Sequence, residues 1–321
     1  MMKLSASVAS VAALGASLLL ALPCAARADY PDKPITMIVP WAAGGSTDQT
    51  ARVLAKAAEQ YLGQPIIIEN KPGASTTLGM ADLARSKPDG YTIGTLSSTA
   101  YLIPLQGRNV PYDPIKSFSF VSYYGDNLIG VAVLKDKPWQ TLKDLIADGK
   151  ENPRKIKYGT AGIGTTQHLT TESLQFQSGA KFVHIPQKGS AGSIPALLGG
   201  HVDFITETSV WAPFVESGQV RLLAVNTPKR AGAYPNVPTL HELGYQSLRS
   251  VQAIIAPAGV PEKVRAKLEA AFRKALSDAK FQQTMQRLHM EVVDLPGAEV
   301  KKLVESEVNR AKQLITKIDK K

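Results

Sequence analysis

Residues 35–70 read ITMIVPWAAGGSTDQTARVLAKAAEQYLGQPIIIEN, and this stretch decides the fold class. The apolar run Ile35–Val39 is followed by a glycine-rich loop, after which apolar residues recur at helical spacing until a glycine and a proline end the pattern. Ser46 and Gln49 fit a capping box that would start this helix. A second short apolar run follows, so the order strand, loop, helix, strand predicts a parallel sheet covered by helices.

The same alternation recurs along the chain and predicts a second α/β unit. Residues 118–133 are rich in β-forming residues and predict a long strand. A second glycine-rich strand-to-helix loop occupies residues 160–168. Further strands are predicted at 91–96, 155–159, 181–185, 201–207, 220–225 and 251–256. The last predicted helix carries one apolar stripe from Val300 to Ile318, with its Lys and Arg residues mostly off the stripe, which is typical of a solvated helix face.

The N-terminal segment, residues 1–28, is typical of a secretory signal peptide. Lys3 supplies a positive start, an uncharged apolar run follows, and Ala26-Arg27-Ala28 forms a cleavage site. We therefore expect an exported mature chain that begins at Asp29. A lipoprotein reading would place the modification at Cys24, but the preceding proline disfavours it.

Composition excludes several classes of protein. The chain has 321 residues, 44% of them hydrophobic, which is enough for two cores and excludes general disorder. Its single cysteine excludes an intramolecular disulfide framework and a cysteine-cluster metal site. The net charge of +10 permits an anionic partner, but no nucleic-acid recognition motif accompanies it, so no nucleic-acid partner is expected.

Motifs for catalysis and for cofactors are missing from the sequence. It contains no G-x-S-x-G, no Walker A loop and no H-E-x-x-H, and its five histidines lack metal-ligand spacing. Gly162–Gln167 is similar to a dinucleotide fingerprint, but its third glycine is replaced by Gln167, and no acid ends the next strand. No cofactor and no metal are therefore expected.

The two glycine-rich loops, residues 43–48 and 160–168, predict a ligand site between the two units. Each loop joins a strand to a helix, where exposed backbone N–H groups and the helix N-terminus favour an anion. Glycines that only permit turns and hydroxyls that only cap helices are the alternative for either loop alone. The repetition of the loop in two similar units favours a ligand held between them.

Several motifs, in order, resemble the Bug (TctC) family of periplasmic solute-binding proteins of tripartite tricarboxylate transporters. The resemblance spans nearly all of residues 30–257 and includes the end of the first strand, the loops and the second domain. The motifs are YPDKPI at 30–35, PWAAGGSTD at 40–48, NKPGA at 70–74, PDGYT at 88–92, GTAGIG at 159–164, KGSA at 188–191 and LGGHVD at 198–203.

The resemblance implies a two-domain periplasmic-binding-protein fold of type II, in which mixed sheets flanked by helices enclose a ligand cleft. Residues 29–127 with 250–321 are expected to form domain 1, and residues 128–249 domain 2. The implied function is a monomeric receptor that delivers a small carboxylate (a di- or tricarboxylate, an aromatic acid or an amino acid) to the membrane subunits of a transporter. The implied ligand-binding residues are Trp41, Ala43, Gly44, Gly45, Ser46, Asp48, Ser97, Ser98, Thr99, Thr160, Ala161, Gly164, Thr165, His168, Asp203 and Glu207.

Within this set, backbone amides of residues 43–46 and 162–166 are expected to hold the carboxylate, with the hydroxyls of Ser46 and Thr165 fixing its orientation. Asp48 is expected to orient the first loop without touching the anion, because like charges repel in a dry cleft. Two other functions remain open: a ligand sensor for a membrane signalling kinase, and an exported α/β enzyme, which the missing nucleophile–base pair disfavours.

Overall fold

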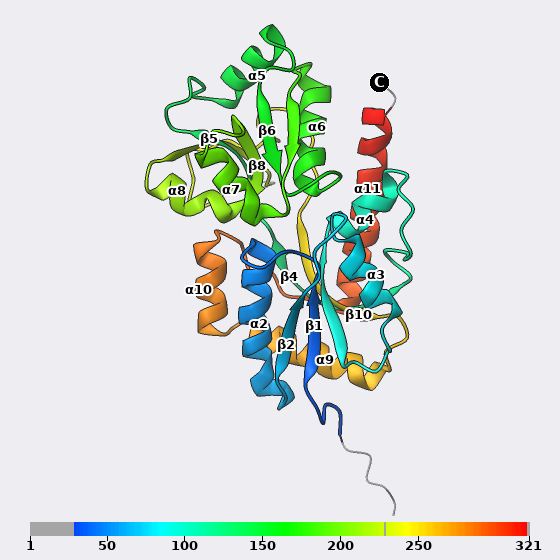
Figure 1. Cartoon of the computed structure of the whole chain (residues 1–321). Helices are drawn as coiled ribbons and strands as arrows, with labels where there is room; N and C mark the ends of the chain where they lie inside the picture. Colours follow the sequence, from blue (N-terminus) through cyan, green and yellow to red (C-terminus); the bar gives the residue numbers. More distant parts are fainter. Residues whose placement is uncertain (1–28, 228, 320–321) are drawn as a thin grey trace, which may run out of the picture.

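Two separate sheets organise the chain (Figure 1), as shown by a computed structural model that describes residues 29–227 and 229–319. The predicted signal peptide lies outside the described residues. The first sheet has the order β11-β4-β10-β3-β1-β2 and the second β7-β6-β8-β5-β9. The strands are β1 (Ile35–Val39), β2 (Ile66–Asn70), β3 (Thr92–Ser97), β4 (Phe118–Asp126), β5 (Ile129–Leu134), β6 (Lys157–Thr160), β7 (Val183–Pro186), β8 (Phe204–Thr208), β9 (Val220–Val225), β10 (Val251–Pro257) and β11 (Leu295–Pro296).

Both sheets are mixed, which confirms the predicted two-domain α/β fold. In the first, β1 runs parallel to β2 and β3, whereas β10 is antiparallel to β3 and β4. In the second, β6 runs parallel to β7 and β8, whereas β5 is antiparallel to β8 and β9. The chain crosses between the sheets after β4 and again before β10. We propose that residues 127/128 and 249/250 mark the domain boundaries.

Helices cover both faces of the first sheet because its strands are apolar on both sides. Ile35, Met37 and Val39 of β1 pack under one layer of helices, and Ile38 packs under the other. The first layer consists of α2 (Ser46–Leu62), α9 (Glu262–Ala275) and α10 (Ala279–Arg287), and the second of α3 (Thr77–Arg85), α4 (Thr99–Leu105) and α11 (Gly297–Asp319).

The second sheet is covered in the same way. Val131 and Val133 of β5 face the core beneath one layer of helices, and Ala132 faces the other. The helices are α5 (Leu142–Glu151) and α6 (Thr166–Ser178) on the first face, and α7 (Ser190–Leu198), η1 (Ser209–Trp211) and α8 (Ala212–Glu216) on the second. Trp211 is fully buried in the second core.

Two local predictions are wrong. The segment 118–133 is not one long strand, because the chain leaves the first sheet after Asp126 and enters the second at Ile129. The capping box at the start of α2 is absent: Gly45 is the N-cap residue and no side chain caps it. The hydroxyl of Ser46 instead donates to Asn127 at the end of the segment that leaves the first sheet, and the Nε2 of Gln49 donates to the carbonyl of Gly44.

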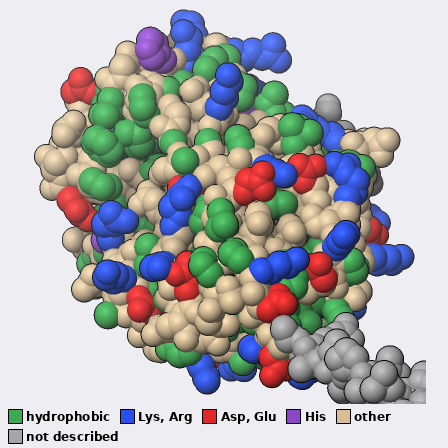
Figure 2. Space-filling model, turned by 60° about the horizontal axis from the view of Figure 1, so that its bottom comes forward, with side chains coloured by type: hydrophobic (Ala, Val, Ile, Leu, Met, Phe, Trp, Pro, Cys, Tyr) green, Lys and Arg blue, Asp and Glu red, His purple; other side chains and the backbone are tan. Residues whose placement is uncertain are grey.

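The surface carries charges of both signs. On the face drawn in Figure 2, Lys and Arg side chains are interspersed with Asp and Glu over both domains. Within residues 29–227 and 229–319, no helix combines the length and the hydrophobicity that crossing a bilayer requires.

Candidate functional site

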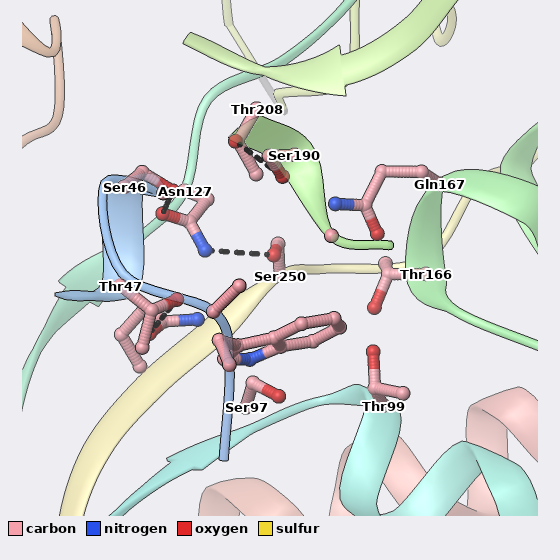
Figure 3. Close-up of a pocket in the computed structure, with 15 residues that line it drawn as sticks. Ser46, Thr47, Ser97, Thr99, Asn127, Thr166, Gln167, Ser190, Thr208 and Ser250 are labelled. Atoms are coloured by element: carbon pink, nitrogen blue, oxygen red, sulfur yellow. Dashed lines mark hydrogen bonds between the residues drawn. The ribbon is translucent and has the colours of Figure 1, made fainter. Parts of the chain in front are cut away.

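A small cavity lies between the two domains, where strands of both sheets reach their carboxyl ends (Figure 3). Ser97 ends β3 and Thr208 ends β8, so each sheet contributes to the wall. The cavity volume is about 20 Å³, which is room for about one water molecule. The lining residues are Trp41, Ala42, Gly45, Ser46, Thr47, Ser97, Thr99, Asn127, Thr166, Gln167, Gly189, Ser190, Thr208, Ser250 and Gln252.

The wall of this cavity is polar but carries no charged side chain among the described residues. Three helices begin at it: α2 at Ser46, α6 at Thr166 and α7 at Ser190. The first N–H groups of a helix lack partners within the helix, and the helix dipole places partial positive charge at that end. Three converging N-termini therefore make a site for an anion without any lysine or arginine.

Two donors on the wall have no partner within the described residues. The Nε1 of Trp41 and the hydroxyl of Ser97 are both buried without a hydrogen bond, and both residues line the cavity. A buried donor without a partner costs about 1–3 kcal/mol. Both donors are therefore available for a polar ligand.

The first glycine-rich loop is held in place by Asp48. The N–H of Gly44 donates to Oδ2 of Asp48 over 2.9 Å, and Gly44 has a φ of 88°, which favours glycine. Arg52 and Asn70 also bond the same carboxylate, with N–O distances of 2.9 and 2.8 Å. Burial alone would raise the pKa of Asp48, but these hydrogen bonds outweigh burial and lower it. Asp48 thus ties the N–H of Gly44 to Arg52 and Asn70 and does not line the cavity.

A chain of polar side chains links the first loop to the two crossings between the domains. The hydroxyl of Ser46 donates to Oδ1 of Asn127 over 3.0 Å, and Nδ2 of Asn127 donates to the hydroxyl of Ser250 over 3.3 Å. The hydroxyl of Thr47 donates to Oε1 of Gln252 over 3.1 Å. The polar floor of the cavity is thus built from the segments that join the domains.

The wall of the second domain is backed by a buried carboxylate. The hydroxyl of Thr208 donates to that of Ser190 over 3.2 Å, and Gln167 lies beside them (Figure 3). Behind them Glu207 is 0% exposed and accepts hydrogen bonds from Gln167 and Ser193. Burial raises the pKa of Glu207 to about 7, although its hydrogen bonds act in the opposite direction.

Five of the sixteen residues predicted to bind ligand line the cavity: Trp41, Gly45, Ser46, Ser97 and Thr99. The others lie outside its lining: Ala43, Gly44, Asp48, Ser98, Thr160, Ala161, Gly164, Thr165, His168, Asp203 and Glu207. Thr166 falls within the range 162–166 whose amides are expected to hold the ligand, and Gly189 and Ser190 belong to the KGSA motif. Ala42 and Thr47 belong to the PWAAGGSTD motif, and Gln167 belongs to the second glycine-rich loop. Sequence reasoning missed the remaining four lining residues, Asn127, Thr208, Ser250 and Gln252.

Several residues outside the lining have clear structural contacts. The hydroxyl of Thr165 caps α6, since it accepts from the N–H of His168 and donates to the carbonyl of Gly162. His168 stacks on His184, with ring centroids 4.2 Å apart, and burial lowers the pKa of each to about 4. Asp203 bonds Nζ of Lys137 over 2.7 Å.

The second glycine-rich loop also contacts the first domain directly. The hydroxyl of Ser75 donates to the carbonyl of Ile163 over 2.7 Å, and Nε2 of Gln106 donates to the carbonyl of Gly164 over 3.0 Å. These two bonds, which we call the latch, join the domains beside the cavity. Because the cavity has room for about one water molecule, a larger ligand requires the domains to separate before it enters.

Comparison with known proteins identifies relatives over nearly the whole chain. The family model described as the tripartite tricarboxylate transporter family receptor (TctC) matches residues 50–320. A UPF0065 protein in the gbd 5′ region of Cupriavidus necator is 38% identical over 312 residues, which cover 97% of this chain and 94% of the relative. The periplasmic binding protein BugD has a similar structure, with a TM-score of 0.85 and 33% identity over 90% of this chain and 99% of the other.

Two further structural neighbours hold dicarboxylates. MatC from Rhodopseudomonas palustris, solved with bound malate, has a TM-score of 0.82 and 26% identity over 89% of this chain and all of the other (100%). Rpa4515 from R. palustris, solved with adipate, has a TM-score of 0.83 and 27% identity over 91% of this chain and 99% of the other.

Proposed function

We propose that this chain, which belongs to the tripartite tricarboxylate transporter receptor (TctC) family of solute-binding receptors, closes its two domains around a small carboxylate in the periplasm. It then delivers the acid to the membrane subunits of a tripartite transporter. We further propose that the mature receptor is a monomer that begins at Asp29 after cleavage behind Ala28.

The observation that carries this proposal is the convergence of three helix N-termini on one uncharged cavity. Domain 1 contributes α2, and domain 2 contributes α6 and α7. The unpaired donors of Trp41 and Ser97 add to the same wall. An anion that accepts many hydrogen bonds fits this donor set, and a carboxylate is such an anion.

The same wall favours acids without an ammonium group. An amino acid would need a carboxylate or several acceptors for its ammonium. Asp48 is already bonded to Arg52 and Asn70, and Glu207 is buried behind the wall. Malate on MatC and adipate on Rpa4515 support an aliphatic dicarboxylate for this chain as well.

An exported enzyme is the weaker alternative. The described lining residues include several hydroxyls but no histidine, carboxylate or cysteine that could activate one of them. A ligand sensor for a signalling kinase would use the same binding step, so it differs from the proposal only in the partner that receives the closed receptor.

A thermal-shift panel tests the proposal. The mature protein is mixed with one acid at a time: malate, adipate, citrate, benzoate or glutamate. At least one acid is expected to raise Tm, because a ligand that binds only the folded state stabilises it by about 2.7 kcal/mol when its concentration is 100 times Kd. Native mass spectrometry of protein purified without refolding then identifies any co-purified acid. Failure of every acid in both measurements would refute carboxylate capture, and conversion of a bound acid, followed by NMR, would favour the enzyme.

A further inference from the structure

Glu207 lies directly behind the cavity wall and contacts the residues that form it. Its Oε1 accepts from the hydroxyl of Ser193 over 2.8 Å. Its Oε2 accepts from the backbone N–H of Thr208 over 3.0 Å and from Nε2 of Gln167 over 3.4 Å. Both Thr208 and Gln167 line the cavity. One layer of side chains therefore separates this carboxyl group from the space that an anion would occupy.

Within residues 29–227 and 229–319, no charged group faces Glu207 from the elements packed around it. Helix α7 presents Ser190 and Ser193, and η1 presents Trp211, whose Nε1 donates to the Glu207 carbonyl over 2.9 Å. On β5 the residue opposite is Gly130.

The titratable groups of α6 turn away from Glu207. His168 stacks on His184, and Glu172 accepts a hydrogen bond from the Tyr158 hydroxyl over 2.7 Å. Among the described residues, Glu207 takes part in no ion pair, so only hydrogen bonds and the nearby N-terminus of α7 offset the cost of its buried negative charge.

We propose that Glu207 is a positioning residue that takes up a proton when a carboxylate enters the cavity, so that ligand binding is coupled to proton uptake. This inference rests on the proposed function. A ligand carboxylate and an ionised Glu207 would be two negative charges in a region of low dielectric, and they would repel each other. The ligand therefore favours the neutral form of Glu207.

The hydrogen bonds around Glu207 survive this protonation. The proton comes from solvent and binds Oε1, which reverses one bond: the hydroxyl of Ser193 turns its own hydrogen away from Glu207 and accepts from the new O–H, because a hydroxyl can accept as well as donate. Oε2 continues to accept from Thr208 and Gln167, so the wall keeps its geometry. Burial raises the pKa of Glu207 to about 7. At neutral pH about half of the free receptor molecules therefore carry a proton on Glu207.

Calorimetry tests the coupling. The probe is the acid of the panel above that raises Tm most, titrated at pH 6, 7 and 8 in buffers that differ in ionisation enthalpy. The wild-type protein is expected to take up about half a proton at pH 7 and to approach one at pH 8, with Kd rising up to about tenfold per pH unit above pH 7. Glu207→Gln, which keeps the shape without titrating, is expected to show no uptake by this site and a flat Kd.

Glu172→Gln is the matched control, because Glu172 is a carboxylate of the same domain that bonds Tyr158 away from the cavity. It is expected to bind with the proton count of the wild type. Equal proton counts in wild type and Glu207→Gln would overturn the inference while leaving carboxylate binding intact, whereas a wild type that binds no acid would overturn both.

If Glu207→Gln does not fold, NMR of the Glu207 side-chain carboxyl carbon in the wild type replaces it. Titration with and without the acid is expected to move the pKa upward on binding by about two units or more, the shift that the expected proton counts require. An unchanged or lowered pKa in the complex would contradict the coupling.

Discussion

The latch bonds of Ser75 and Gln106 exist only while the domains are closed, and this leads to our most demanding prediction. Both donate to backbone carbonyls of the second glycine-rich loop, over 2.7 and 3.0 Å, and neither residue lines the cavity. A variant with Ser75→Ala and Gln106→Ala removes both bonds across the boundary. Alanine suits position 75, since the adjacent Ala74 adopts a similar φ of 44°.

The expected effect on affinity follows from the two lost bonds. Each hydrogen bond contributes about 0.5–1.5 kcal/mol net, so the closed form loses roughly 1–3 kcal/mol. Because the ligand enters when the domains are apart, destabilising the closed complex relative to the open free receptor is expected to raise Kd by roughly 5- to 150-fold. Most of the change should fall on the rate of release, because the latch acts after the ligand has entered.

Calorimetry and stopped-flow release kinetics on the double variant measure these quantities. Ser86→Ala with Gln282→Ala is the matched control, because these side chains also donate to backbone carbonyls, of Asp82 and Leu276, but within domain 1. The control is expected to bind like the wild type. Wild-type affinity and release rate in the latch variant would refute the idea that these bonds stabilise closure around the ligand.

Three further predictions concern the first loop and the buried histidines. Ser46→Ala is expected to raise Kd by roughly ten- to a hundred-fold, because a hydrogen bond to a charged group contributes about 1.5–3 kcal/mol. Calorimetry measures this Kd, and wild-type affinity in the variant would exclude a contact between the Ser46 hydroxyl and the ligand. Gly44→Val is expected to lower Tm more than Gly45→Val, because φ is 88° at Gly44 and −72° at Gly45; equal losses of Tm would contradict this. Burial lowers the pKa values of His168 and His184 to about 4, so on acidification the unfolded chain binds protons at these imidazoles before the folded chain does. The free energy of unfolding is therefore expected to fall as the pH is lowered from 6.5 to 4. Urea titrations measure how steeply this free energy depends on pH, and the dependence should be smaller in His184→Asn.

The alternation of strands and helices could be predicted from the sequence because each element carries its own periodicity. The run Ile35–Val39 and the helix after it alternate in the predicted way, and the glycine-rich loop between them begins the wall of the cavity. The break between β4 and β5 could not be predicted in this way. Both sides of Asn127 have high β propensity, and only the pairing of each half with a different sheet separates them.

The cavity was harder to predict than the fold, because its floor comes from segments that meet only in three dimensions. Asn127 and Ser250 come from the two crossings and Gln252 from the start of β10, and no local motif marks a polar residue there as functional. Thr165 shows the opposite difficulty. A hydroxyl at the start of a helix suits a cap and a ligand contact equally, and in the structure the hydroxyl of Thr165 is the cap.

Under the proposed function, the distribution of helix N-termini between the domains makes binding depend on closure. Domain 1 supplies the N-terminus of α2, and domain 2 supplies those of α6 and α7, so a carboxylate bound to one open domain would meet only part of the donor set. Because no lysine or arginine lines the described cavity, the weaker partial charges must converge to hold the anion. The ligand thus gains its full set of donors only when the domains close, and a change that destabilises closure should weaken binding without touching the acid.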